Sequence, residues 1–202
     1  MKVIGITGGI GSGKSLVTRL LRDKYGAYIC DTDRIAKEQM EVGGESYQGV
    51  VDYFGREILA QDESIDRSKL AKIVFEDKEK RLKLNELTHP NVLRAVREEI
   101  ETYRHMGNVP YLVIETALMI ESGYDFICDE VWYVYTPEAE RRRRLKKERG
   151  YSDEKINTIF ESQSKVEQFR GKFPIVIENI GSVSILEEQV ELQLKGKKTL
   201  MK

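Results

Sequence analysis

Short apolar runs alternate with longer stretches of helical periodicity along the 202-residue chain. Near-continuous apolar runs predict five strands, at Val3–Thr7, Ala27–Cys30, Tyr111–Glu115, Val131–Tyr135 and Ile175–Ile177. Runs of this kind, without alternating polar positions, are typical of strands that helices cover on both faces. Strands that alternate with helices favour a parallel sheet with crossover helices. We therefore expect an α/β core.

The segment between the second and third predicted strands is unusually long. It has helical patterns but no convincing strand, with Asp66 and Asp77 as predicted N-caps and a helix predicted over Asn91–His105 with Pro90 in its first turn. About 70 residues separate the two strands, far more than one crossover helix requires. We therefore predict a helical insertion over residues 38–106, a place where substrate commonly binds.

Two more helices are predicted after the fourth strand. Thr136 is the expected N-cap, and Pro137 the expected first residue, of a helix that carries the Arg141–Arg144 run. The last helix is expected to open with a capping box at Ser184-x-x-Glu187.

A glycine-rich motif lies between the first predicted strand and a helix predicted over Lys14–Tyr25. The residues Gly8-Gly9-Ile10-Gly11-Ser12-Gly13-Lys14-Ser15 match the pattern G-x-x-x-x-G-K-[ST]. Main-chain N–H groups of such a loop can turn inward around phosphate oxygens, and the following helix points its positive end at the same anion. Lys14 would contact the β- and γ-phosphates, and the Ser15 hydroxyl would coordinate Mg²⁺. We interpret this motif as a nucleotide phosphate site and not as a glycine-rich turn with a chance lysine.

The arginine-rich segment indicates which class of phosphate-binding protein this is. The sequence has no N-K-x-D segment, which a GTPase would need to read guanine. It has instead Arg141, Arg142, Arg143, Arg144 and Arg149 on one predicted helix. In small-molecule kinases a helical lid carries arginines that neutralise the transferring phosphoryl group. A solvated helix face is the alternative, and helical spacing allows only one or two of the five to point into a cleft.

Two carboxylates follow the second strand, in Cys30-Asp31-Thr32-Asp33. The carboxyl ends of strands in such sheets face the ligand crevice, and a spacing of two points both side chains to one side. We expect Asp33 to orient an acceptor hydroxyl and receive its proton, although it could also cap a helix that begins at Arg34. Asp31 could hold Mg²⁺ through water.

Three further side chains are open to two interpretations. His89 is either a ligand contact or a structural histidine. Glu115 and Glu121 flank the end of the third strand, and either could lie at the cleft or be an ordinary solvated carboxylate.

Charge and composition restrict the partners. Lys and Arg number 33 against 34 Asp and Glu, and a formal charge of −1 argues against a general nucleic-acid binder, although a local basic pocket remains compatible. The longest stretch without a charged residue, Val3–Gly13, has 11 residues, and a membrane span needs roughly 20. Two cysteines and no recognisable secretory signal favour a cytoplasmic protein. We expect no nucleic-acid or membrane partner, and a monomer or weak homo-oligomer.

From Ile6 to about Val190, the chain resembles the dephospho-CoA kinase family, whose members phosphorylate the ribose 3′-hydroxyl of dephospho-CoA. The matching segments, in order, are the phosphate motif from Thr7 to Ser15, Asp31 to Ala36, Asp52 to Gly55, Ile65 to Arg67, Leu84 to Pro90, Leu118 to Ser122, Gln163, and Val176 to Asn179. Each segment after the phosphate motif is a weak signal alone, but the ordered series is highly specific.

The resemblance implies a P-loop α/β fold like that of nucleoside monophosphate kinases, a three-layer sandwich with a five-stranded parallel sheet. It implies a nucleotide-binding core at 1–37 and 107–202, a helical lid at about 137–165, and a dephospho-CoA-binding insertion at 38–106. The expected reaction converts ATP and dephospho-CoA to ADP and coenzyme A, with Mg²⁺, and the alternative is a kinase for another nucleotide or small metabolite.

The resemblance also carries residue roles onto matching positions. The general base falls on Asp33, the ATP loop on Gly11 to Leu16, and an adenine-side loop near Asn179. The lid arginine falls on the Arg141–Arg144 run, where we choose Arg144. The segment Arg149-Gly150-Tyr151 is one residue shorter than the family's usual lid turn, which leaves the register of these arginines open. The expected substrate-binding residues are Asp31, Asp33, Phe54, Gly55, Arg67, His89, Leu118 and Glu121.

Overall fold

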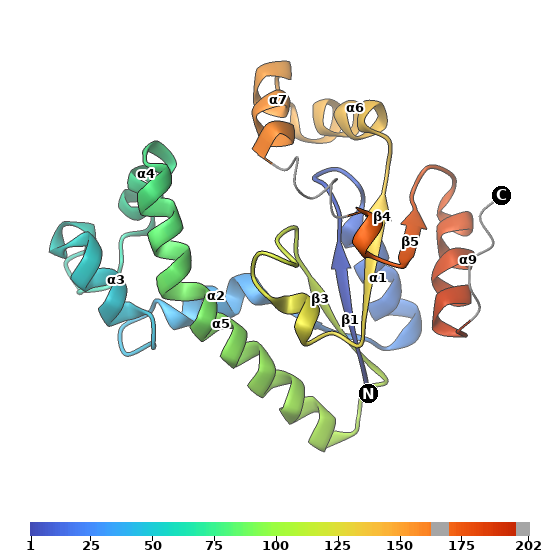
Figure 1. Cartoon of the computed structure of the whole chain (residues 1–202), viewed down its shortest axis with the longest axis horizontal. Coiled ribbons are helices and arrows are strands. Elements are labelled where there is room, and N and C mark those ends of the chain that lie inside the picture. Colours follow the sequence, from blue (N-terminus) through green and yellow to red (C-terminus); the bar gives the residue numbers. More distant parts are fainter. Residues whose placement is uncertain (163–169, 197–202) are drawn as a thin grey trace. The chain divides into compact units, whose positions relative to one another are not determined.

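Five parallel strands form one sheet in the computed structural model, which describes residues 1–162 and 170–196 (Figure 1). The strand order is β2-β3-β1-β4-β5. The strands are β1 Lys2–Thr7, β2 Tyr28–Cys30, β3 Tyr111–Glu115, β4 Glu130–Tyr135 and β5 Ile175–Glu178. Each lies within one residue of its predicted bounds, so the strand predictions are confirmed. Because all strands run the same way, the segments that follow them meet at one edge of the sheet.

Helices make up most of the remaining described chain. They are α1 Lys14–Tyr25, α2 Thr32–Gln39, α3 Tyr47–Phe54, α4 Arg67–Glu76, α5 Lys78–Met106, α6 Glu138–Arg149, α7 Asp153–Ser162 and α9 Val183–Leu194. Short 3₁₀ turns are η1 Arg56–Ile58, η2 Tyr124–Phe126 and η3 Arg170–Lys172. No helix in the described ranges combines the length and apolar character that a membrane crossing requires.

The chain divides into two compact units, which we call the sheet unit and the helical unit. The sheet unit comprises Met1–Cys30 and the chain from Tyr103 onward, and the helical unit comprises Asp31–Thr102. Residues of α1 and α9 pack with apolar strand residues in the core of the sheet unit, as Val17, Leu21 and Leu186 illustrate. This packing explains the unbroken apolar runs, because helix-covered strands leave few positions for polar side chains.

The helical unit has a core of its own. It consists of the buried residues Val50, Val51, Phe54, Ile58, Ile65 and Leu70. Asp66 caps α4 as predicted, since its Oδ1 accepts hydrogen bonds from the N–H groups of Ser68 (3.0 Å) and Lys69 (3.2 Å). The only departure from helix and loop in this unit's described residues is an isolated bridge between Leu59 and Ile65.

Helix α5 is longer than the sequence suggested. The prediction of a separate helix over Asn91–His105 was wrong, because the helix runs unbroken over Lys78–Met106 with Pro90 inside it. The predicted cap at Asp77 is confirmed by its bonds to the N–H groups of Glu79 and Lys80. Buried side chains lie on both sides of the proline, from Thr88 to Ile100, and this packing stabilises the helix across the missing N–H.

Two predicted N-caps also differ from the structure. Helix α6 begins at Glu138 with Pro137 at the N-cap, so Thr136 does not cap it. Helix α9 is capped by Ser182, whose Oγ accepts a hydrogen bond from the N–H of Ile185, and not by Ser184. Ser182 has the extended backbone that an N-cap requires. The helix therefore begins directly after Ser182, before the predicted capping box is reached.

Candidate active site

The glycine-rich loop connects β1 to α1 at the carboxyl edge of the sheet. Its first glycine, Gly8, has a φ of 145°, and a Cβ there would lie 2.4 Å from the carbonyl oxygen of Val134. Its last glycine, Gly13, has a φ of 91°, and a Cβ there would lie 2.0 Å from Nδ2 of Asn179. Both positions therefore need glycine for backbone conformation and for space.

The loop is held from β4 and β5 by hydrogen bonds to one carbonyl oxygen. The oxygen of Ser12 accepts from Nδ2 of Asn179 (2.8 Å) and from Oγ1 of Thr136 (2.9 Å). Thr136 Oγ1 also lies 3.0 Å from the carbonyl oxygen of Asn179, and all three residues are buried. Thr136, predicted to be a helix cap, thus connects the loop to the end of β5.

A cavity of about 560 Å³ opens beside this loop. Four cationic side chains line it, and two carboxylates oppose them. The cations are Lys14, Arg19, Arg144 and Arg149, and the acids are Glu115 and Glu148. Most of the predicted nucleotide residues line this cavity, namely Gly11, Gly13, Lys14, Ser15, Leu16 and Asn179. The predicted Gly8, Gly9 and Ser12 belong to the loop but do not line the cavity. An excess of positive charge next to the N-terminus of α1 suits a polyphosphate.

Lys14 is folded back onto the loop. Its Nζ donates to the carbonyl oxygens of Gly8 (2.9 Å) and Gly9 (3.3 Å). Burial lowers the pKa of Lys14 to about 8; Glu115 opposes this shift, and the charges of Arg141 and Arg149 add to it. A phosphate beside the ammonium group would favour its charged form.

Ser15 and Glu115 place oxygen atoms at the same cavity. The Ser15 hydroxyl donates to Oε1 of Glu115 at 2.8 Å. Hydroxyl and carboxylate oxygens are ligands that Mg²⁺ prefers, and this ion commonly takes few protein ligands when phosphates supply the rest. The sequence left open whether Glu115 or Glu121 lies at the cleft, and only Glu115 lines the cavity. Its place as the last residue of β3, beside β1, is the signal that separates it from Glu121.

The five arginines of α6 have different surroundings. Arg144 and Arg149 line the cavity. Arg143 is bonded to Glu140, which also accepts from Arg144 Nε at 3.0 Å. Hydrogen bonds from Arg143 and Arg144 lower the pKa of Glu140 to about 2. Arg141 is buried with its guanidinium 4.7 Å from the ring centre of Phe160.

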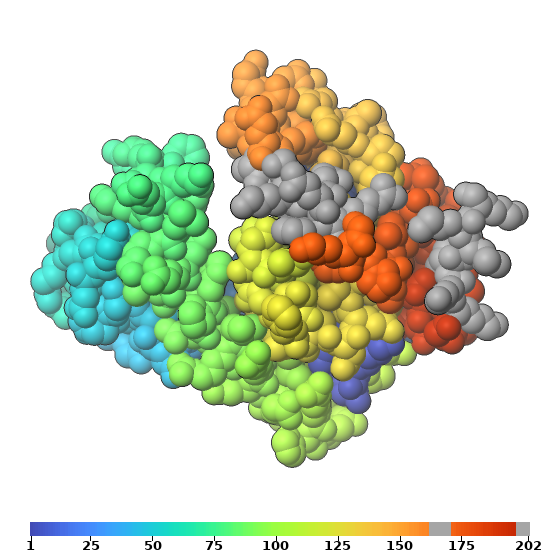
Figure 2. Space-filling view, in the orientation of Figure 1, coloured from blue at the N-terminus to red at the C-terminus, as the bar shows by residue number. Residues whose placement is uncertain are grey.

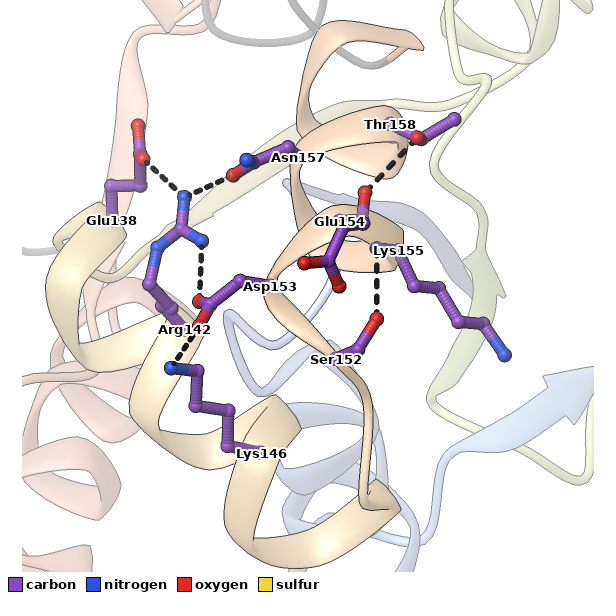
Figure 3. A network of polar contacts seen from close by, with 9 residues as sticks. All are labelled: Glu138, Arg142, Lys146, Ser152, Asp153, Glu154, Lys155, Asn157 and Thr158. Carbon is purple, nitrogen blue, oxygen red and sulfur yellow. Dashed lines mark hydrogen bonds and ion pairs between the residues drawn. The ribbon is translucent and has the colours of Figure 1, made fainter.

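The remaining arginine joins α6 to α7. Arg142 donates to Asp153 (3.2 Å), Asn157 (2.8 Å) and Glu138 (3.4 Å), as Figure 3 shows. The same Asp153 accepts from Lys146 at 2.7 Å. The atoms of the two helices form one continuous surface in Figure 2. Arg142 therefore supports the described part of the predicted lid and does not face the cavity.

The predicted carboxylates Asp31 and Asp33 lie at the start of α2, in the helical unit. Asp31 is the N-cap, and its Oδ1 accepts from the N–H of Arg34 at 2.9 Å. The alternative that Asp33 caps this helix was wrong, because α2 already begins at Thr32. The Asp33 side chain lies in the first turn of α2 and is exposed. Because Asp31 caps the helix, the Asp33 carboxylate is not needed as the cap.

The other predicted substrate-binding residues of the helical unit are spread over several elements. Phe54 ends α3 and is buried in that unit's core, so its side chain has a packing task. Gly55 has a φ of 85°, Arg67 begins α4, and His89 lies in α5, where burial lowers its pKa.

Three predicted positions belong to the sheet unit's part of the chain. Leu118 is exposed and follows β3. Glu121 also follows β3 and is exposed. Gln163, one mark of the family resemblance, lies outside the described residues.

Comparison with known proteins identifies one family. The family model described as dephospho-CoA kinase matches residues 2–184. The dephospho-CoA kinase of Carboxydothermus hydrogenoformans is 40% identical over 190 residues, covering 94% of this chain and 91% of that protein. The structure of dephospho-CoA kinase from Campylobacter jejuni has a TM-score of 0.69 at 24% identity, with 96% of each chain covered.

The fold extends beyond that family. Shikimate kinase from Acinetobacter baumannii shares it with a TM-score of 0.55 at 15% identity, covering 98% of this chain and 96% of that one. The predicted fold class, a P-loop α/β core with a five-stranded parallel sheet, is confirmed.

Proposed function

The chain belongs to the dephospho-CoA kinase family, and we propose that it transfers the γ-phosphoryl group of ATP to the ribose 3′-hydroxyl of dephospho-CoA. The products would be ADP and coenzyme A, which makes this the last step of coenzyme A biosynthesis. The observation that carries the proposal is the cationic cavity around the glycine-rich loop, in a chain that matches one family over nearly its whole length.

The loop and Lys14 would bind the nucleotide's phosphates. Main-chain N–H groups at the start of α1 favour negative charge, and Lys14 would exchange its bonds to Gly8 and Gly9 for phosphate oxygens. Transfer would be direct and in line, without a covalent enzyme intermediate. Asn179 contacts the loop at Ser12, and this contact supports the prediction that Asn179 lies on the nucleotide side of the cavity.

Ser15 and Glu115 would hold Mg²⁺. When bound, the ion would neutralise part of the negative charge of the phosphates. Asp31 stays a predicted ligand through water. Its oxygen that caps α2 is Oδ1, which leaves Oδ2 for that task.

Asp33 would orient the acceptor hydroxyl and take its proton. Phe54, Gly55, Arg67 and His89 stay predicted acceptor contacts of the helical unit. Leu118 and Glu121 stay predicted acceptor contacts of the loop after β3.

We also propose a cytoplasmic monomer or weak homo-oligomer without nucleic-acid or membrane partners. The balanced charge of 33 basic and 34 acidic residues supports the absence of a nucleic-acid partner.

A panel of acceptors tests the function. Purified protein with ATP and Mg²⁺ is offered dephospho-CoA, adenosine, AMP, shikimate and deoxyadenosine, and ADP release is followed by a coupled assay. We expect ADP and coenzyme A to form in equal amounts with dephospho-CoA, and a KM at least about tenfold higher for every other acceptor. Turnover of another acceptor with a lower KM would favour the alternative kinase. Slow ATP hydrolysis that no acceptor changes would indicate a nucleotide-dependent switch instead.

Asp33→Asn tests the proposed base. We expect kcat to fall about 10²-fold or more with ATP affinity little changed, because the amide cannot accept the proton. Asp62→Asn is the matched control, because it makes the same change at an exposed carboxylate of the helical unit that has no proposed role at the site. It should leave kcat and ATP affinity unchanged. Near wild-type turnover in Asp33→Asn would remove this residue from the role.

A further inference from the structure

Three arginines line the cavity, Arg19 from α1 and Arg144 and Arg149 from α6, and of the two on α6, Arg144 already has partners. Its Nε donates to Oε1 of Glu140 at 3.0 Å, and its NH2 donates to the carbonyl oxygen of Asn179 at 3.0 Å. Its side chain is only 19% exposed. To reach a phosphate, this guanidinium would have to leave a carboxylate and a carbonyl that fix its position.

The partner of Arg144 in turn holds the glycine-rich loop. Asn179 accepts from Arg144 through its carbonyl oxygen and donates through Nδ2 to the carbonyl oxygen of Ser12. Gly13 follows directly and has no room for a Cβ beside that amide. Arg144 is therefore connected through one residue to the backbone that would surround the phosphates.

Arg149 is the last residue of α6 and lines the same cavity. Among the described residues, no hydrogen bond or ion pair to this guanidinium is found. Its charge, like that of Arg141, contributes to the lowered pKa of Lys14, and Lys14 and Arg149 both line the cavity. An arginine with no bond to residues 1–162 or 170–196 can bind an incoming anion without breaking a bond to any of them.

We propose that these two arginines have separate tasks, and the proposal rests on the function proposed above. Arg149 is the catalytic arginine that contacts the γ-phosphoryl group, and Arg144 is a positioning residue that acts through Asn179. This replaces the expectation that Arg144 itself touches the transferring group. As the bond from γ-phosphorus to its bridging oxygen breaks and the bond to the 3′-oxygen forms, Arg149 stabilises the spread charge while Asp33 takes the hydroxyl proton.

Affinities for ATP and ADP separate the two tasks, because only ATP carries a γ-phosphate. We expect Arg149→Ala to weaken ATP binding about tenfold and leave ADP binding within about twofold, with kcat about 10²-fold lower. Arg149→Lys should recover part of kcat, since lysine keeps the charge without the planar fork. Arg144→Ala should instead weaken ATP and ADP by the same factor, because it acts on the loop that binds both.

Lys147→Ala is the matched control, because it removes an exposed cation of α6 that does not line the cavity. It should leave both affinities and kcat unchanged. Isothermal titration calorimetry gives the affinities, the coupled assay gives kcat, and circular dichroism checks that each variant is folded.

The assignment is overturned if Arg149→Ala weakens ATP and ADP equally, or if Arg144→Ala alone loses the preference for ATP. The titrations need no acceptor, so the division between the arginines is tested even if dephospho-CoA proves not to be the substrate. Failure of the function would appear separately, as absent turnover of dephospho-CoA by the unaltered protein.

Discussion

Gly13 shows how little space the nucleotide loop leaves at the scale of one residue. The position lies at the N-cap of α1, with left-handed backbone and the Asn179 amide against it. An added methyl group would meet Nδ2, the atom that binds the carbonyl oxygen of Ser12. Substitution here therefore acts on the loop's support as well as on its backbone.

Gly13→Ala and Gly150→Ala form a matched pair that separates these two effects. Both glycines have left-handed backbones, with φ of 91° and 63°, but nothing lies within 4 Å of a Cβ at Gly150. We expect Gly150→Ala to reduce the free energy of unfolding by about 1–2 kcal/mol from backbone strain alone. Gly13→Ala should reduce it further, and weaken ADP binding more than about tenfold. Urea denaturation and titration calorimetry measure the two quantities, and equal effects of the two changes would contradict a steric role for Asn179.

Residues of the phosphate motif could be placed at the cavity from the sequence, but their side-chain partners could not. Lys14 and Ser15 follow from the motif because its spacing fixes them on the first turn of one helix. The choice between Glu115 and Glu121 depends on which of them reaches the cavity, and the proposed choice between Arg144 and Arg149 depends on their side-chain partners. Sequence spacing along one element carries no such information.

At the scale of elements, Thr136 shows that hydrogen bonds between elements can outweigh a local N-cap signal. Threonine before proline at the start of α6 is a reasonable cap by local chemistry, yet its hydroxyl faces two buried carbonyl oxygens from the loop and from β5. Buried acceptors without donors are costly, and this requirement outweighs an N-cap that solvent can replace. Pro90 illustrates the same rule in α5, where packing on both sides outweighs a missing N–H.

Thr136→Val and Thr136→Ser test that connection. Valine has a similar shape without the hydroxyl, so we expect it to lower the free energy of unfolding by about 1–3 kcal/mol and to weaken nucleotide binding. Serine keeps the hydroxyl and should lose less stability, about 1 kcal/mol for the removed methyl group. Thermal unfolding followed by circular dichroism compares them. A valine variant as stable as the unaltered protein would show that the hydroxyl has no such role.

For the whole molecule, the five strands and their parallel arrangement could be read from apolar runs, because strands in a helix-covered sheet have a distinctive composition. The long interval between β2 and β3 likewise predicts extra helices, and the compact unit Asp31–Thr102 lies in that interval with a core of its own. Its task in binding the acceptor stays a prediction, since apolar packing specifies a fold and not a ligand.

The two donors on the Ser12 carbonyl oxygen have an energetic consequence for ligand affinity. A loop that β4 and β5 already hold in shape has little conformational entropy to lose when a nucleotide arrives. Such preorganisation favours ADP as much as ATP, because both present phosphates to the same backbone. Release of the product ADP, and not the phosphoryl-transfer step, is then expected to limit turnover.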